Sequence, residues 1–296
     1  MTNSFKGFHP IVNFYYFTVV IIFSMFFMHP IFLGISLISS FIYSVSLNGK
    51  KAVKFNLLYM FPLLIIMAIM NPAFNHQGVT ILFYLKSGNP MTLESILYGI
   101  AAAVMFISVI LWFSCYNAVM SSDKFIYLWG RVIPGTSLII SMVLRFVPRY
   151  KAQIKVISNG QKCIGRDVTN GNIITRAKNG IKILSIMTTW ALENAIETAD
   201  SMKSRGYGLK GRTSFSIFRF DKRDKITFSL MVALTIIILI GSFLGENTIV
   251  YYPIIKVKAI TAFSVLVYIA YILLCLMPFI IDFKEEIKWK HLALEN

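Results

Sequence analysis

The sequence predicts an all-α fold: a polytopic membrane helix bundle of about six spans, with long amphipathic helices on the cytoplasmic side. Hydrophobic residues make up 56% of the 296 residues and charged residues only 14%, whereas a soluble domain is about 45–50% apolar and about 25% charged. The apolar residues form long continuous runs, which excludes the alternating pattern of an outer-membrane barrel. Most of the positive charge lies in one segment between two of these runs.

The uncharged runs set the number of spans. No charged residue occurs from Gly7 to Gly49, although a single span needs only about 20 residues. Because proline disfavours helix in the residue before it, a turn at His29-Pro30 divides this run in two. A third span ends at Asn71-Pro72, and residues 73–90 follow as a loop or a re-entrant segment. The predicted spans are residues 11–28, 30–47, 55–70, 95–122, 226–244 and 259–281.

Residues 132–144 leave the number of spans open. This apolar stretch is short for a span, and it runs on into Arg145 and Pro148. We interpret it as a buried or partly inserted helix, with a seventh span as the alternative. Three regions result: membrane spans in 1–131, a cytoplasmic helical region in 132–225, and membrane spans with a cytoplasmic tail in 226–296.

Lysine and arginine in short loops orient the chain, because such loops stay on the cytoplasmic side. Lys50, Lys51 and Lys54 lie between the second and third spans, whereas the loop after the third span has only Lys86. With six spans, both termini are therefore cytoplasmic. None of the six spans contains an ionisable residue, which argues against a secondary transporter or channel working through this chain alone.

The basic segment is one long insert between the fourth and fifth spans. Residues 145–225 contain 17 of the 29 lysines and arginines but only six acidic residues. Apolar residues recur three or four apart, which predicts helices at about 148–164, 173–182 and 181–203. Gly180 is a possible kink, and Gly206 ends the last helix. A connection does not need about 80 residues. The insert is therefore interpreted as a docking platform for a soluble protein, and contact with anionic lipid is the alternative.

Two motifs in the insert resemble a known family. Leu144-Arg145-Phe146-Val147-Pro148 is followed about 50 residues later by a helix end that contains Ser204-Arg205-Gly206-Tyr207-Gly208. Together they resemble the transmembrane T component of energy-coupling factor (ECF) transporters, a family that includes the membrane subunit of cobalt and nickel uptake systems. The resemblance implies a prokaryotic plasma-membrane subunit with long coupling helices, and Arg145, Phe146 and Pro148 would serve the coupling structure or its substrate-binding partner.

The resemblance also implies partners and contact residues. Family members bind two ABC-type ATPase subunits through Ala-Arg-Gly motifs and a small membrane S component that carries the vitamin or metal. Here Ser204, Arg205 and Gly206 match the second motif. The first motif would lie at Ile164, Gly165 and Arg166, and the register that keeps the glycine puts Ile164 in the arginine's place, with Arg166 as an alternative.

No catalytic or metal-binding pattern accompanies these motifs. The sequence has no G-x-x-x-x-G-K-[ST] phosphate loop, so we expect no cofactor in this chain and expect ATP to be bound by the partners. The three cysteines and four histidines form no metal-ligand spacing, and the basic segment of a membrane protein does not indicate nucleic acid. The sequence thus predicts a non-enzymatic transporter subunit; the alternative is a membrane scaffold or enzyme whose basic insert binds lipid or another protein.

Overall fold

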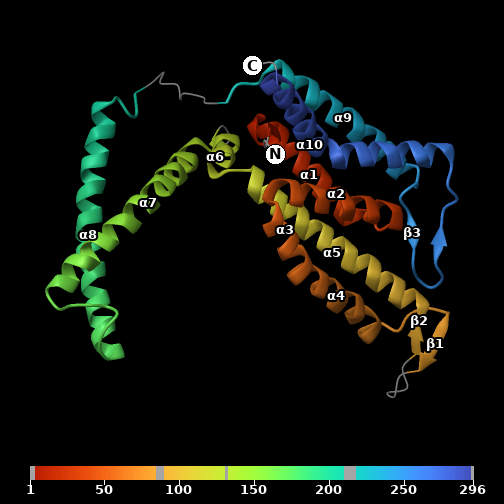
Figure 1. Cartoon of the computed structure of the whole chain (residues 1–296), viewed down its shortest axis with the longest axis horizontal. Helices are drawn as coiled ribbons and strands as arrows, with labels where there is room; N and C mark the ends of the chain where they lie inside the picture. The colour runs from red at the N-terminus through yellow and green to blue at the C-terminus, as the bar shows by residue number, and fades with distance from the viewer. Residues whose placement is uncertain (1–3, 85–89, 131–132, 210–217, 295–296) are drawn as a thin grey trace. The chain divides into compact units, whose positions relative to one another are not determined.

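The computed structural model describes residues 4–84, 90–130, 133–209 and 218–294. The chain divides into two compact units (Figure 1). The first, here called the bundle unit, comprises the chain up to residue 125 and from residue 218 onward. The second, the helix-pair unit, comprises residues 126–217. The short helix α6 (Ser122–Gly130) is the covalent link that leads from one to the other.

The bundle unit consists of apolar helices, with short hairpins at two connections. Among the described residues, five helical segments are long and apolar enough to cross a membrane, and α1 is apolar but shorter. This confirms the predicted all-α polytopic bundle. The elements are η1 (Ser4–Gly7), α1 (Pro10–Phe26), α2 (Pro30–Asn48), α3 (Lys50–Phe55), the π-helical turn η2 (Asn56–Met60), α4 (Phe61–Phe74), α5 (Leu93–Val119), α9 (Lys222–Phe243) and α10 (Ala262–Leu294).

Histidine and proline start the first two apolar helices in the same way. His9 and His29 are the N-cap residues of α1 and α2, and each is followed by a proline in the first helical position. The Nδ1 atom of each histidine accepts a hydrogen bond from the backbone N–H two residues later, at 3.3 and 3.4 Å. Proline suits this position because its fixed φ is helical and the missing N–H has no intrahelical partner. The predicted turn at His29-Pro30 is confirmed.

Small polar groups connect the helices in the buried centre of the bundle. Ser24 of α1 and Ser36 of α2 share a hydrogen bond of 2.6 Å, and Trp112 Nε1 of α5 donates to Ser36 Oγ at 3.0 Å. The Tyr16 hydroxyl donates to the carbonyl of Cys275 in α10 at 2.8 Å. Hydrogen bonds of this kind hold helices together in lipid, where burial of apolar area gives no advantage.

Contacts between distant residues divide the helix ends into two groups. At one end, the Phe5 N–H donates to Asp282 at 2.8 Å, and Arg223 pairs with Glu285 at 3.0 Å. Lys124 also donates to the Lys6 carbonyl at this end. The beginning of the chain, the start of α6 just after α5, the start of α9 and the later part of α10 therefore lie together.

The opposite helix ends also meet one another. The Tyr251 hydroxyl donates to the Met28 carbonyl at 2.8 Å, and Asn75 Nδ2 donates to the Tyr252 hydroxyl at 3.2 Å. The turn after α1, the end of α4 and the connection between α9 and α10 thus share one end. The six apolar segments run alternately up and down, as six successive spans require.

Two details of the membrane segments differ from the sequence prediction. The prediction that Asn71-Pro72 ends the third span is wrong, since α4 continues through Pro72 to Phe74. Pro72 lies in the last turn of α4, and beside it Asn71 Nδ2 donates to the Ser95 carbonyl of α5 at 2.8 Å, which holds the two helices together there. The following connection is an antiparallel hairpin of β1 (Ile81–Tyr84) and β2 (Pro90–Thr92), and its residues 85–89 lie outside the described part.

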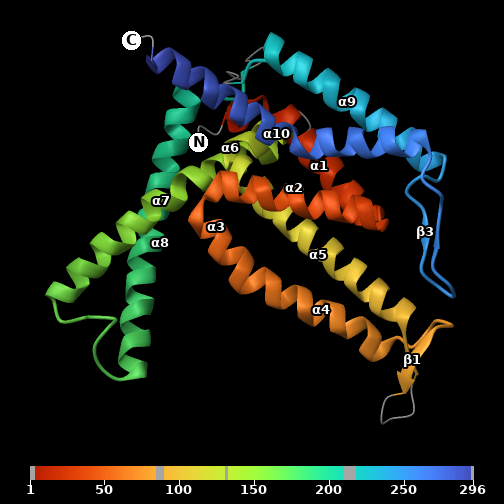
Figure 2. The same ribbon diagram turned by 45° about the vertical axis from the view of Figure 1, so that its right-hand side comes forward.

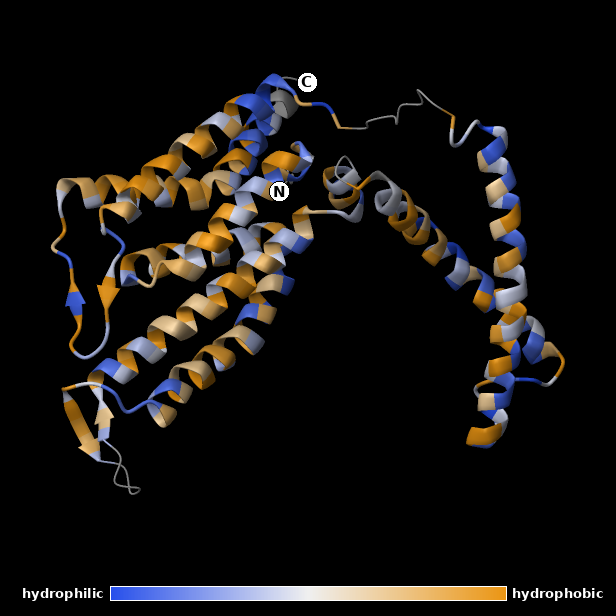
Figure 3. Cartoon of the chain, turned by 180° about the vertical axis from the view of Figure 1, so that it is seen from behind, coloured by the Kyte–Doolittle hydropathy of each residue, from blue (hydrophilic) through white to orange (hydrophobic). Residues whose placement is uncertain are grey.

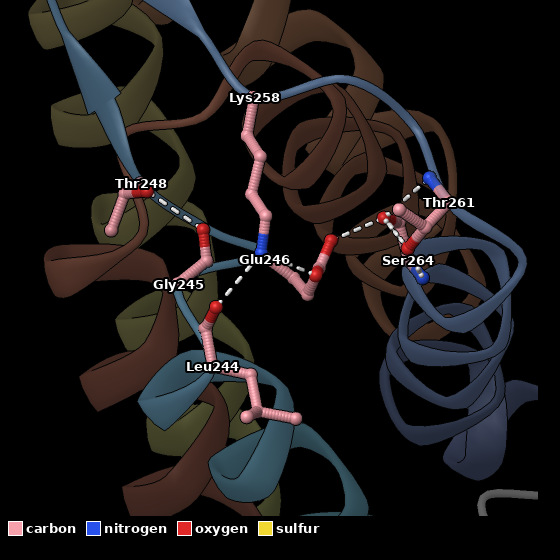
Figure 4. A network of polar contacts seen from close by, with 7 residues as sticks. All are labelled: Leu244, Gly245, Glu246, Thr248, Lys258, Thr261 and Ser264. Carbon is pink, nitrogen blue, oxygen red and sulfur yellow. Dashed lines mark hydrogen bonds and ion pairs between the residues drawn. The ribbon is translucent and has the colours of Figure 1, made fainter.

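A second hairpin, β3 (Ile249–Val250) and β4 (Lys256–Val257), joins α9 to α10 and carries a buried carboxylate (Figure 4). Glu246 is 6% exposed and accepts hydrogen bonds from Lys258 Nζ at 2.7 Å and from the Ser264 hydroxyl. These two donors lower the pKa of Glu246, because they stabilise its charged form. Lys258 also donates to the Leu244 carbonyl at 2.9 Å, so the network ties the end of α9 to the start of α10.

We expect Lys258→Met to lower the unfolding temperature of the detergent-solubilised protein at neutral pH, because it leaves the buried Glu246 charge without its main partner. The pKa of Glu246 is lower in the folded protein than in the unfolded chain, where a glutamate has a pKa of about 4.3. The ionised carboxylate therefore stabilises the fold above this pH, and the stability is lost as pH falls through the pKa of the folded protein. The variant should therefore lose less stability on acidification than the wild type. Lys256→Met, at an exposed position of β4, is the control. Equal thermal shifts for both variants would contradict this account of the network.

The helix-pair unit consists of two long helices, α7 (Pro134–Cys163) and α8 (Ile173–Ser204). α7 joins the predicted short apolar stretch to the predicted helix after Pro148, and it is not among the described helices that are apolar enough to be a further span. Residues 173–204 form one helix, so the predicted separate helices at 173–182 and 181–203 are corrected. Gly180 does not break α8; a Cβ there would lie 3.8 Å from Val168 of the preceding loop. Polar and apolar residues alternate along both helices (Figure 3).

Candidate partner-binding site on the helix pair

The C-terminal end of α8 holds the second predicted motif in a fixed conformation. Gly206 has φ of +76° and donates its N–H to the Lys203 carbonyl at 2.9 Å, and Tyr207 donates to Met202 at 3.0 Å. This pair of hydrogen bonds is a Schellman cap, which favours glycine in its left-handed position. Arg205 is the C-cap residue immediately before the glycine, and its side chain is exposed. The negative end of the helix dipole favours a cation at this position.

The C-terminal end of α7 has the same cap. Gly165 has φ of +74° and donates to the Lys162 carbonyl at 3.0 Å, and Arg166 donates its backbone N–H to Gln161 at 2.9 Å. Ile164 is therefore the C-cap residue, in the position that Arg205 occupies on α8, and 61% of its surface is exposed. Arg166 is the structural counterpart of Tyr207 rather than of Arg205. In cap position, Gly165 thus corresponds to Gly206 and Ile164 to Arg205.

The loop after the first motif is held to the start of α8. The carboxylate of Asp167 accepts hydrogen bonds from the backbone N–H and the hydroxyl of Thr169, at 2.9 and 2.7 Å, and Lys162 lies 3.5 Å away. The backbone and hydroxyl donors of Thr169, followed by Lys162, lower the pKa of Asp167. Arg176 Nε donates to the Val168 carbonyl at 2.8 Å, and Asn179 Nδ2 donates to the Asp167 carbonyl at 2.9 Å. Ile164 therefore precedes an ordered turn.

An aromatic contact joins α7 to α8 next to the Arg145–Pro148 motif. Trp190 of α8 lies edge-on to Tyr150, with ring centroids 5.6 Å apart, and the Arg149 guanidinium lies 5.4 Å from the Trp190 ring centre. Phe146 stacks on Tyr150 at 5.7 Å. Both ribbon views show the two helices crossing (Figures 1 and 2). Cation–π contacts of this type contribute about 0.5–1 kcal/mol at exposed sites.

A cleft of about 810 Å³ lies between the first half of α7 and the last turns of α8. It brings together Arg145, Phe146 and Pro148 of the first resemblance motif and Arg205 of the second. Ile164, Gly165 and Arg166 do not line it. They cap α7, and the loop that follows them is held to the first turns of α8. α8 has 32 residues, which is about 48 Å at 1.5 Å per residue. The two predicted contact motifs thus lie at opposite ends of α8.

Several cleft residues were not predicted from the sequence. Asn194, Glu197 and Ser201 line it from α8, and Met142 and Leu138 line it from α7. With Trp190 and Arg205, the α8 residues recur at intervals of three and four, which is the spacing of one helix face. That spacing was the signal that could have identified them.

Comparison with known proteins bears out the resemblance. No family model matches the chain. The chain is 37% identical over 105 residues to the energy-coupling factor transporter transmembrane protein EcfT of Lactobacillus helveticus, covering 35% of the chain and 38% of that protein. It is 33% identical over 110 residues to EcfT of Staphylococcus aureus, covering 37% and 41%. It is 30% identical over 158 residues to EcfT of Leuconostoc gelidum, covering 50% and 59%.

The matched part of the chain thus spans between about two fifths and three fifths of the length of these relatives. Matches at 30–37% identity in several bacterial species agree with the two motifs and with the bundle of apolar helices. Over part of its length the chain is therefore similar in sequence to the transmembrane proteins of energy-coupling factor transporters.

Proposed function

We propose that this chain is the transmembrane coupling subunit of an ATP-driven ECF-type importer for vitamins or transition-metal ions. It would transmit the conformational change of two ABC-type ATPases to a small membrane S component that binds the substrate. The observation that carries the proposal is the pair of matching caps, one at the C-terminal end of α7 and one at the C-terminal end of α8, in a chain that also forms an apolar helix bundle. Such a rigid pair of helices offers two separate attachment points for two partners.

The side chains at the two caps determine how each partner could bind. Arg205 is exposed, fixed in its backbone conformation and without a hydrogen bond or ion pair among the described side chains. A guanidinium so placed can bind a carboxylate with two parallel hydrogen bonds. Because α8 is one continuous helix, a displacement at Arg205 would be carried along its length. ATP itself would be bound by the partners.

The two attachments would differ in chemistry. Ile164 presents an apolar side chain where Arg205 presents a cation, in the same cap geometry. We infer that one ATPase receives an apolar side chain in its groove and that the other receives a guanidinium. Arg166 would lie beside the first contact and not at its centre.

Ile164→Glu is expected to weaken the first ATPase contact strongly, because a charge would replace an apolar side chain at the interface. Arg166→Glu should have the smaller effect, since Arg166 follows the glycine. The measurement is ATPase retention on the tagged chain during purification at fixed salt. A larger loss with Arg166→Glu would reassign the first contact to Arg166.

The proposed location is the plasma membrane of a prokaryote, with both termini cytoplasmic. Support comes from the helix end at which Phe5, Lys124, Arg223 and Asp282 meet. The chain leaves the bundle there for the basic insert and returns to it, and the positive-inside rule assigns such an end to the cytoplasm.

The test is purification of the tagged chain from its native cells in mild detergent, with identification of bound proteins by mass spectrometry. The proposal predicts two ABC-type ATPase chains and a small hydrophobic protein. Recovery of the chain alone, with lipid, or with an unrelated enzyme would contradict it and favour a scaffold whose insert binds lipid or another protein.

A further inference from the structure

We infer that Arg145 and Arg205 together bind one acidic segment of an ATPase subunit in the cleft between α7 and α8. The inference rests on the proposed function and extends it, because it assigns Arg145 to an ATPase contact. The resemblance alone would leave Arg145 to the coupling structure or the S component. The structure instead places it in the same cleft as the second contact motif.

The placement of the two arginines is the first argument. They belong to different helices, yet both line the cleft of about 810 Å³. The Schellman cap fixes the backbone of Arg205, and the Trp190 contact with Tyr150 and Arg149 fixes the crossing close to Arg145. Two guanidinium groups thus start from ordered backbone positions on opposite walls.

The charge of the cleft is the second argument. Arg145, Arg149 and Arg205 line it against one carboxylate, Glu197. Arg149 lies over the Trp190 ring. Within the described residues, neither Arg145 nor Arg205 takes part in any of the ion pairs or side-chain hydrogen bonds. Two unpaired cations in one concave surface repel each other, and an anion that enters relieves this repulsion.

The mixed lining favours a protein segment over a lipid headgroup. Leu138, Met142 and Met202 give the cleft an apolar part, and Glu197 adds a negative charge. A folded segment can set apolar side chains against the methionines, carboxylates against the arginines and a polar or basic group beside Glu197, whereas a phosphate supplies only the negative charge. The planar guanidinium also matches a carboxylate in a two-bond geometry.

The test is a double-mutant cycle on the intact chain in nanodiscs, with the affinity for the purified ATPase pair as the readout. The variants are Arg145→Ala, Arg205→Ala and both together. Lys155→Ala on α7 and Lys178→Ala on α8 are matched controls, because both lysines are exposed and neither lines the cleft. Thermal unfolding of each variant reports on its fold. Arg145→Lys keeps the charge but loses the planar guanidinium, and it replaces Arg145→Ala in the cycle if that variant does not fold.

We expect each single variant to weaken ATPase binding at least about tenfold, since removing one partner of a desolvated charge pair is costly. The fold-loss of ATPase affinity in the double variant should be clearly smaller than the product of the two single fold-losses, because both arginines bind one segment. The lysine controls should change binding less than about twofold. Arg145→Lys should retain only part of the affinity.

Three outcomes would overturn the inference. If Arg205→Ala weakens binding and Arg145→Ala does not, or if the two losses simply multiply, the cleft does not hold one shared segment, although the proposed function stands. If ATPase affinity is unchanged but binding of the chain to anionic phosphatidylglycerol vesicles falls in both variants, the cleft holds lipid headgroups. Unchanged ATPase affinity in all variants would also count against the proposed function.

Discussion

Arg205→Glu is expected to abolish substrate uptake while leaving the protein inserted in the membrane at normal levels. The substitution removes a guanidinium whose loss from a desolvated contact costs about 2–5 kcal/mol, and it introduces a charge that repels the expected carboxylate. Because Arg205 is exposed at the end of α8, the helix itself should remain folded. The measurement is uptake of labelled substrate by cells, together with quantification of the membrane-inserted chain.

Lys203→Glu is the matched control for this experiment. Lys203 is also exposed and lies in the last turn of the same helix, but it does not line the cleft. It should leave uptake near the wild-type rate, although the change in net charge is identical. If cells with Arg205→Glu take up substrate normally, or if both variants lose uptake equally, Arg205 does not have the specific role assigned to it.

Gly99→Ala is expected to destabilise the bundle unit by about 1–3 kcal/mol, the usual cost of overpacking. A Cβ at Gly99 of α5 would lie 2.6 Å from the Ala68 carbonyl oxygen of α4 and 3.1 Å from Pro72. The carbonyl belongs to helical backbone and cannot rotate away, so α4 must move as a whole. Thermal unfolding in detergent, followed by intrinsic fluorescence, measures the loss.

Gly34→Ala in α2 is the control, because a Cβ there has no neighbour within 4 Å. Alanine at an unobstructed helical position stabilises by roughly 0.5–1 kcal/mol relative to glycine. The two substitutions should therefore shift the unfolding temperature in opposite directions. A neutral Gly99→Ala would mean that α4 and α5 do not approach as closely as described.

The membrane segments could be predicted largely from the sequence because their signal is local. Uncharged runs and the His29-Pro30 pair located most helix ends to within a few residues. The exception is α10, which continues to Leu294 past the predicted end at residue 281, because its later part carries charged residues. The continuation of α4 for two residues past Pro72 was not predicted, because proline disfavours helix in the residue before it. The short hairpins were missed because their few residues carry no periodic pattern.

The helix pair shows the same division between local and tertiary information. Glycines at 165 and 206 marked both helix ends correctly, because a left-handed cap favours that residue. Gly180 suggested a kink that does not exist, since α8 runs through this position without a break and a Cβ there would make only an ordinary contact with Val168. The cleft could not be predicted, because Arg145 and Arg205 become neighbours only through the crossing of α7 and α8 at Trp190.

The central claim is that the two capped ends of the helix pair each contact an ATPase. Its most direct test places a photo-crosslinking residue, benzoylphenylalanine, separately at positions 164 and 205 in living cells. The account predicts that each position crosslinks to an ABC-type ATPase, whereas an exposed position in the middle of α7, such as 155, does not. Crosslinks from positions 164 and 205 to lipid, to an unrelated protein or to nothing would contradict it.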